Sequence, residues 1–459
     1  MSPGESGQPK ERRSNYRSIM KGLVYPVILF FISGMLAVSA GEKIKLTLTE
    51  AQALALEQNP TLAVAEANIR AAAAAVESAV SAYYPTLGFS AGLTRVRDSA
   101  TRPQRDFDND SRYEAGIAAS WLLYDGGARH LAKLIAERGG DIAVASCDDA
   151  RRTLLENVAY AFFTVVQSRN SMKIALQDAE FNRVLHKDAQ TRLENGVAKP
   201  SEVLNFEFQV GEAEVSYITA ERTWYNSCIV LGQLLALERE QIWEILELVE
   251  PDPDELDGKM GDLAGMLAYA REHRPDYLSA QYSIVRAQME LQKADTEYVP
   301  TVSAFYNYGF ERMGSGHFNT HYDRDLNFGL KLDWTLFSGF STEAKRAAAQ
   351  AQLDAARNSL EQVDLAISAE IRRNDVALSA SRRTLEKQNK QYEIAKKIRD
   401  LVKEEYDGGT ATITRLNEVQ TDLTNAALAR NNAYIQVLNN IEALKSSTGY
   451  TLTAVRNGK

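Results

Sequence analysis

Few residues in the chain are spaced for catalysis or metal binding. His317 and His321 lie in one polar loop and resemble a metal-binding pair, but no third ligand is fixed by spacing. The sequence contains no phosphate-binding P-loop, no zinc-protease HExxH and no redox CxxC. We therefore expect no enzyme activity, no cofactor and no metal site, and we interpret the two histidines as part of a solvent-exposed loop.

The two cysteines, Cys147 and Cys228, are not expected to form a disulfide. Both fall in helical sequence around a turn near residue 197, one 50 residues before it and the other about 31 after it. In an antiparallel helical hairpin this difference separates them by roughly 28 Å along the axis. That distance is too long for a disulfide bond.

The elements that position the remaining residues include two pairs of predicted strands. The first pair reads PTLGFSAGLTR and RYEAGIAASWLLYDGG around a polar loop, and the second reads PTVSAFYNYGFER and DLNFGLKLDWTLFSGF. Apolar and polar residues alternate in each run, and alternation over about ten residues is typical of a strand that crosses an outer membrane. We expect strands at about 85–97, 112–124, 300–312 and 325–337.

A soluble sandwich with one buried face is the alternative, but the rest of the chain offers no second sheet for it. Trp121 and Tyr124 at the end of the first pair, with Tyr298 and Trp334 beside the second, favour an aromatic girdle at a membrane interface. Four strands cannot close a barrel, and lipid tolerates no open strand edge. Since a barrel needs at least about eight strands, a dimer is the minimum and a trimer would give twelve; the residues alone leave both open.

Residues 1–40 are typical of an export signal peptide. A basic lead precedes an apolar stretch at 22–38, and the sequence VSA then fits a small-x-small cleavage site before Gly41. An uncleaved anchor helix is the alternative, and the start codon stays open between Met1 and Met20. Cleavage after residue 40 would change the formal net charge from −9 to about −12, which argues against nucleic acid as a partner.

Helical periodicity fills most of the remaining chain. We expect one helix over about 128–194, a turn at Asn195-Gly196, and a second helix over 201–237 with a heptad seam typical of a coiled coil. Helical segments 50–82 and 201–237 together nearly equal the length of 128–194. Two short helices stacked end to end beside one long helix would therefore form a long helical cylinder, with strands at one end and glycine turns at the other.

The second half of the chain repeats the first. Pro60 matches Pro275 at an offset of 215 residues, and Trp121 matches Trp334 at an offset of 213. Gly196 matches Gly409, again at 213. We therefore divide the chain into the signal peptide at 1–40, a first repeat at 41–237, an equatorial linker at 238–262, a second repeat at 263–449, and a tail at 450–459.

The repeat, the paired hairpins and the turn sequences NGVAKPSEVLNFEFQ and DGGTATITRLNEVQTDL resemble the TolC family of outer-membrane efflux ducts over about residues 46–449. The resemblance implies a mainly α homotrimer with four strands per chain in a shared twelve-stranded β-barrel within outer-membrane lipid. It also implies a long antiparallel α-barrel in the periplasm of a Gram-negative bacterium. The implied function is a passive exit duct for efflux or type I secretion, docked on a periplasmic adaptor (membrane fusion protein) that is fed by an inner-membrane pump of the RND or ABC type.

The same resemblance implies where the working residues lie. Adaptor hairpins dock at the two glycine turns in the family, which implies the pairs Gly196-Val197 and Gly409-Thr410. Family members close the entrance just past these turns, and the matching positions are Glu202, Tyr406, Arg415 and Glu418.

This sequence departs from the family pattern at two of the closing positions. The first of two family acids is replaced by Arg415, and a family base is replaced by Ala411. The closure network is therefore only partly preserved. A pair formed by Arg415 and Glu418 of adjacent chains could replace it, with a solvated surface pair as the alternative.

Two rival functions compete with the duct. One is a structural or adhesin-like coiled-coil surface protein anchored by a trimeric barrel, although the strand pairs in both halves fold every helix back toward the membrane. The other is a soluble cytoplasmic helical scaffold, which would require the export signal to be spurious. Within the duct interpretation, drug, metal and polypeptide cargo are all left open, because the pump selects the substrate.

Overall fold

The computed structural model describes residues 44–97, 109–197, 199–237, 242–252, 262–313 and 323–456. The elements below lie in the compact unit Lys45–Lys459, except that the first strand begins at Ile44. The predicted signal peptide and the pair His317 and His321 lie outside the described residues. Within the described ranges, no helix is both long and apolar enough to span a membrane.

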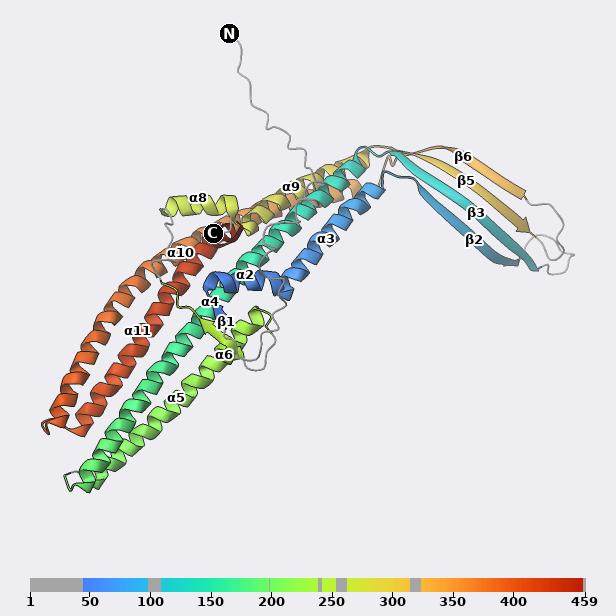
Figure 1. Cartoon of the computed structure of the whole chain (residues 1–459). Coiled ribbons are helices and arrows are strands. Elements are labelled where there is room, and N and C mark those ends of the chain that lie inside the picture. Colours follow the sequence, from blue (N-terminus) through green and yellow to red (C-terminus); the bar gives the residue numbers. More distant parts are fainter. Residues whose placement is uncertain are drawn as a thin grey trace, which may run out of the picture. The chain divides into compact units, whose positions relative to one another are not determined.

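Two long helices, each of 67 residues, dominate the fold: α4 (Ala128–Glu194) and α10 (Ser341–Asp407). Each turns back into a shorter antiparallel helix that packs along it, α5 (Pro200–Leu234) after α4 and α11 (Ile413–Thr448) after α10 (Figure 1). We call α4 with α5 the first hairpin and α10 with α11 the second hairpin. The remaining helices are α2 (Leu48–Gln58), α3 (Pro60–Ser81), α6 (Ile242–Ile245), α8 (Leu263–His273), α9 (Pro275–Asp295), the short 3-10 helix η1 (Thr296–Tyr298) and α12 (Tyr450–Arg456).

Glycine in the left-handed conformation ends both long helices. Gly196 has φ of 75° and Gly409 has φ of 77°, values that cost glycine little. In each turn, the next amide bonds back across the helix end: the Val197 N–H donates to Arg192 O at 2.8 Å, and the Thr410 N–H donates to Glu405 O at 2.8 Å. These bonds satisfy carbonyl groups that would otherwise have no hydrogen-bond partner within the helix, and they fix where each hairpin turns.

The four long strands form one antiparallel sheet in the order β2-β3-β5-β6. Their bounds are Thr86–Arg97, Asn109–Tyr124, Thr301–Met313 and Asp323–Asp333. Strands β2 and β6 each have one neighbour, so the sheet has two open edges. The predicted alternation places large apolar side chains on one face, where Leu87, Phe89, Phe328 and Leu330 are all exposed. A second, two-stranded sheet pairs β1 (Ile44–Leu46) with β4 (Leu246–Leu248).

The fourth strand is shorter than the predicted 325–337, and that prediction is wrong at its end. Strand β6 stops at Asp333, which pairs with Thr301, the first residue of β5. Pro300 precedes Thr301 and has no N–H to extend the ladder. Strand β3 begins at Asn109 rather than at the predicted 112. Its first residue, Asn109, pairs with Arg97 at the end of β2.

The short helices meet the hairpins end to end at two joints. At the first joint, Asn59 Nδ2 donates to Leu234 O at 2.9 Å, in the last turn of α5. The Asn59 side-chain oxygen accepts from the Thr61 N–H at 2.9 Å, in the first turn of α3. One amide side chain therefore caps both helices. This is the end-to-end arrangement that the helix lengths predict.

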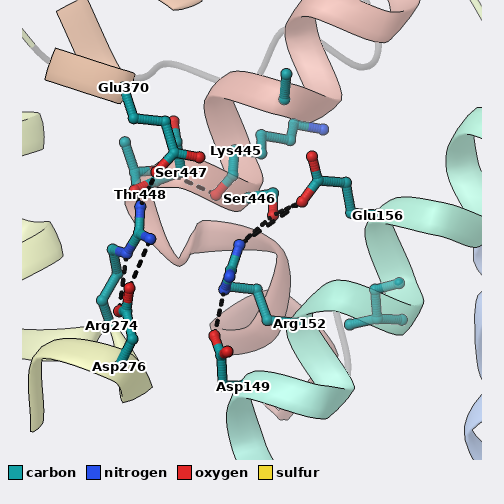
Figure 2. Close-up of polar contacts among 12 residues, drawn as sticks. Asp149, Arg152, Glu156, Arg274, Asp276, Glu370, Lys445, Ser446, Ser447 and Thr448 are labelled. Atoms are coloured by element: carbon teal, nitrogen blue, oxygen red, sulfur yellow. Dashed lines mark hydrogen bonds and ion pairs between the residues drawn. The ribbon is translucent and has the colours of Figure 1, made fainter. Parts of the chain in front are cut away.

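Arg274 occupies the second joint, where α9 meets α11 (Figure 2). It is 4% exposed, and its guanidinium donates to Ser447 O at 2.8 Å near the end of α11. It also pairs with Asp276 at 2.8 Å and with Glu370 of α10 at 2.7 Å. Burial disfavours the charged form, but the bonds to these two carboxylates outweigh it and raise the pKa of Arg274.

Arg152 of α4 approaches the same helix end from the first hairpin (Figure 2). Its guanidinium donates to Ser446 Oγ at 3.0 Å and to Asp149 Oδ1 at 2.9 Å. The last turn of α11 therefore lies between two buried guanidinium groups, a favourable arrangement for the negative end of a helix dipole. An apolar cluster continues the packing of the second hairpin against α8; its buried members are Met266, Ala270, Ile367, Ile371, Leu378, Val437, Ile441 and Leu444.

We expect Arg274→Ala to lower the stability of the helical region by about 3–5 kcal/mol, because it leaves two carboxylates and a helix-end carbonyl without their buried partner. The measurement is the loss of helical circular dichroism on heating the purified chain in detergent. Arg271→Ala is the matched control, because Arg271 makes two bonds of 2.7 Å to Asp364 on the exposed surface. The Arg271→Ala control should leave the midpoint of thermal unfolding nearly unchanged. Equal shifts for both variants would contradict a special role for the joint.

Candidate functional site at the helical turns

Tyr406 links the two hairpins close to their turns. It lies in the last turn of α10, is 7% exposed, and donates its phenol O–H to the carboxylate of Glu202 in the first turn of α5. Its ring packs edge-on against Phe206 at 6.2 Å, and the guanidinium of Arg192 lies 5.0 Å from the ring centre. Burial and the bond to Glu202 raise the pKa of Tyr406, so the phenol remains a proton donor at neutral pH.

An apolar cluster surrounds this bond and takes side chains from all four hairpin helices. Its buried members are Leu185, Ala189, Phe206, Val402, Tyr406, Leu416 and Val419. The Tyr406 phenol and the Glu202 carboxylate are therefore the polar part of a mainly apolar contact between the hairpins. A hydrogen bond in such surroundings is strengthened by the low local dielectric.

Two further polar contacts join the hairpins at this level. The Arg192 guanidinium of α4 donates to Asp407 at 3.2 Å. Asn417 Nδ2 of α11 donates to Asn205 Oδ1 of α5 at 2.9 Å. None of these four residues is predicted as a site residue from the sequence. A usable signal exists for Arg192, which precedes Gly196 by about one helical turn and so lies at the same end of the first hairpin as Glu202.

Arg415 and Glu418 do come together, within α11. Arg415 NH1 lies 2.7 Å from Glu418 Oε2, at i,i+3 spacing and with both side chains exposed. Within the single chain, the pair therefore has the geometry of a solvated surface pair. Exposed pairs of this kind contribute little to stability.

The turn residues Gly196, Val197, Gly409 and Thr410 are all exposed. A Cβ built on either glycine would meet no atom within 4 Å, so both turns face open space. Val197 presents an apolar side chain there that is 80% exposed. The two turns therefore offer accessible surface beside the Tyr406 contact.

The predicted interface aromatics lie where the strands join the helices. The Trp121 indole N–H donates to Tyr83 O at 3.0 Å, and the Trp334 indole N–H donates to Tyr298 O at 3.2 Å. Tyr124 and Tyr298 are exposed beside them. Each indole thus ties a strand end to the helical segment that precedes its strand pair. Within the described ranges, no three metal-ligating side chains come together.

Comparison with known proteins places this geometry in a family. The sequence profile of outer membrane efflux proteins matches residues 52–237 and 266–450. The chain belongs to the outer membrane efflux protein family. The predicted resemblance is therefore confirmed, and this efflux protein is an outer-membrane channel with a helical periplasmic extension.

Individual relatives are distant but cover most of the chain. Protein CyaE of Bordetella pertussis is 26% identical over 384 residues, which span 83% of this chain and 79% of that protein. The pyoverdine export outer membrane protein OpmQ of Pseudomonas aeruginosa is 25% identical over 377 residues, 80% of this chain and 78% of that protein. The crystal structure of the Campylobacter jejuni CmeC outer membrane channel superposes with a TM-score of 0.74 at 19% identity, over 88% of this chain and 85% of that chain, and so shares the fold.

We expect Tyr406→Phe to loosen the turn end of the efflux protein without unfolding it. The variant keeps the ring between Phe206 and Arg192 but loses one hydrogen bond, worth about 1 kcal/mol. Amide hydrogen exchange near the ends of α10 and α11 should therefore become about fivefold faster at pH 7, as measured by mass spectrometry. Tyr392→Phe makes the same change on α10 at a ring that lies under Arg430 of α11, and should leave exchange at the turns unchanged. Equal exchange in wild type and Tyr406→Phe would show that the phenol bond does not hold the hairpins together.

Proposed function

We propose that this efflux protein is the exit duct of a three-part export assembly. It would conduct substrate passively from a periplasmic adaptor and an inner-membrane pump of the RND or ABC type to the exterior. The observation that carries the proposal is the contact of Tyr406 with Glu202, which closes one hairpin against the other beside two exposed turns. A passage that must open on demand needs such a contact at its periplasmic end, and we call this end the entrance.

The exposed turns are the proposed docking surface for the adaptor. Val197 and Thr410 stand at the tips of the two hairpins, next to glycines with open space around them. An adaptor that grips both tips could move one hairpin relative to the other. Such a movement would act directly on the Tyr406 contact, because that contact spans the hairpins.

The two halves of the chain are proposed to be copies of one unit. Helices α4 and α10 have the same length of 67 residues. The bond from Trp121 to Tyr83 O has its counterpart in the bond from Trp334 to Tyr298 O. Asn59 and Arg274 hold equivalent positions at the two joints and donate to equivalent helix-end carbonyls.

A trimer with a shared twelve-stranded barrel is the proposed assembly. Strands β2 and β6 leave open edges that only another chain can pair in lipid. Helix α5 also carries an apolar stripe whose members are 60–64% exposed in the single chain: Leu204, Phe208, Val215 and Ile218. Their spacing follows one face of a helix, as a helix–helix interface requires. A neighbouring copy would remove this face from water.

The cargo is proposed to be set by the pump and not by the duct. The name of the relative OpmQ specifies pyoverdine export. In this chain, the side chains at the entrance form a closing contact between helices. A drug, a metal ion or a polypeptide therefore fits the proposal equally well.

The duct proposal is tested by conductance in planar lipid bilayers. Wild-type protein should give a small, stable conductance, and the double variant Tyr406→Phe with Arg192→Ala should raise it several-fold by removing two contacts between the hairpins. Arg183→Ala is the matched control, since Arg183 pairs with Glu214 at 2.7 Å inside the first hairpin only. No ion current from any variant would refute the duct. Equal currents from wild type and the double variant would show that these contacts do not close the entrance.

The trimer is tested by native mass spectrometry of detergent-purified protein. Val215→Asp places a charge on the α5 stripe and should convert most of the trimer to monomer. Val184→Asp makes the same change at an exposed valine of α4, outside the stripe, and should leave the trimer intact. If the wild-type protein is a monomer or a dimer, the proposed assembly is wrong.

A further inference from the structure

A second polar contact joins the hairpins farther from the turns. Asp178 of α4 accepts two hydrogen bonds on Oδ1, from Gln420 Nε2 at 2.6 Å and from Thr424 Oγ1 at 2.8 Å, both on α11. Asp178 lies 16 residues before the end of α4 at Glu194. At 1.5 Å per residue this places it about 24 Å from that end. The contact is thus separate from the Tyr406 contact and is not used by the function proposed above.

Gln420 is held in one orientation by groups of opposite charge. Its Nε2 faces the Asp178 carboxylate, while its Oε1 accepts from Arg399 NH1 of α10 at 3.4 Å. The side chain is buried, with 7% exposed. The Arg399 guanidinium also lies 5.0 Å from the ring centre of Phe181, which is three residues after Asp178 on α4. The amide therefore links α10 and α11, the two helices of the second hairpin, to the Asp178 carboxylate of α4.

Asp178 also lines a groove. The groove has a volume of about 590 Å³ and is lined by residues of α4, α5 and α11. Its lining is rich in amides and hydroxyls and includes one other carboxylate, Glu212 of α5, but no lysine or arginine. Water can therefore replace the bonds to Asp178 as α11 moves away from α4, so the contact can break and re-form without leaving a buried charge unsolvated.

We propose that Asp178 is a positioning residue for the closed entrance. By holding Gln420 and Thr424, it sets the distance of α11 from α4 and so places Tyr406 against Glu202. The proposal rests on the duct function above, in which the second hairpin moves relative to the first. Bonds to a charged acceptor are among the stronger hydrogen bonds in proteins, so the loss of two of them should shift the entrance toward its open form.

The variants remove the contact from either helix. Asp178→Ala deletes the acceptor, and Gln420→Leu deletes one donor from the opposite side. Asp178→Asn is the conservative variant, because its amide oxygen can still accept from Gln420 and Thr424. Glu212→Ala is the matched control, since it removes a carboxylate from the same groove that does not hold α11.

In planar bilayers, Asp178→Ala and Gln420→Leu should each raise the open fraction of the channel several-fold, and the two together should add little to either one alone. Asp178→Asn should recover most of the wild-type behaviour, and Glu212→Ala should match wild type. Hydrogen exchange should become faster in α11 around residues 420–428 but not in α5. A purely structural role for Asp178 would instead lower the thermal midpoint with no rise in open fraction, and would overturn the proposal.

The controls separate this proposal from the duct function. If the Tyr406→Phe with Arg192→Ala variant opens the channel and neither Asp178→Ala nor Gln420→Leu does, the positioning role is wrong and the duct stands. If wild type and every variant fail to conduct, the duct itself is wrong. If Asp178→Ala does not fold, the α11 variants Gln420→Leu and Thr424→Val test the same contact. A wild-type open fraction in both variants would contradict the positioning role of Asp178.

Discussion

A strand edge in lipid cannot leave its backbone N–H and C=O groups without partners, and the assembly proposed for this chain depends on that constraint. The sheet of β2, β3, β5 and β6 exposes two edges and one apolar face, which in the proposed barrel would be paired by neighbouring chains and covered by lipid. Each strand pair leads into a long helix. Trp121 and Trp334, at the ends of the strand pairs, bond the segment that precedes their own strand pair. The sheet and the helices therefore hold a fixed connection in both halves.

The two joints show how one structural task is met by different chemistry. Asn59 uses a neutral amide, with its N–H donating to one helix end and its oxygen accepting from the next. Arg274 can only donate, so Asp276 provides the acceptor for the start of α9, through the Tyr277 N–H at 2.9 Å. A buried guanidinium also needs more negative partners than an amide does. Glu370 meets that need and ties α10 into the second joint, which makes this joint a contact of three helices.

Much of the fold follows from local sequence. Helix α4 has the predicted bounds because a glycine turn limits each end, and the cysteines lie apart on α4 and α5 as the helix spacing requires. The end of β6 could not be predicted without its pairing with β5, because Pro300, just before β5, stops the ladder. Tyr406 and Glu202 were found by resemblance, because residues 204 apart show no periodicity that links them. Asp178 and Arg192 were missed for the same reason: each looks like an ordinary solvated charge on a helix until α10 and α11 are placed beside α4.

The contacts between the hairpins change character along their length. Farther along the helices from the turns, the contacts are made by polar side chains, as in the bonds from Gln420 to Asp178 and from Asn431 to Gln167 O. At the turns they are mainly apolar, and Phe206 and Tyr406 pack there with residues from four helices. Separation of the polar stretch exchanges hydrogen bonds for bonds to water, at a net cost on the order of 1 kcal/mol per bond. Separation at the turns exposes aromatic surface to water and is unfavourable. The isolated chain should therefore rest with its turns together, and an outside partner that covers the exposed rings would be needed to hold them apart.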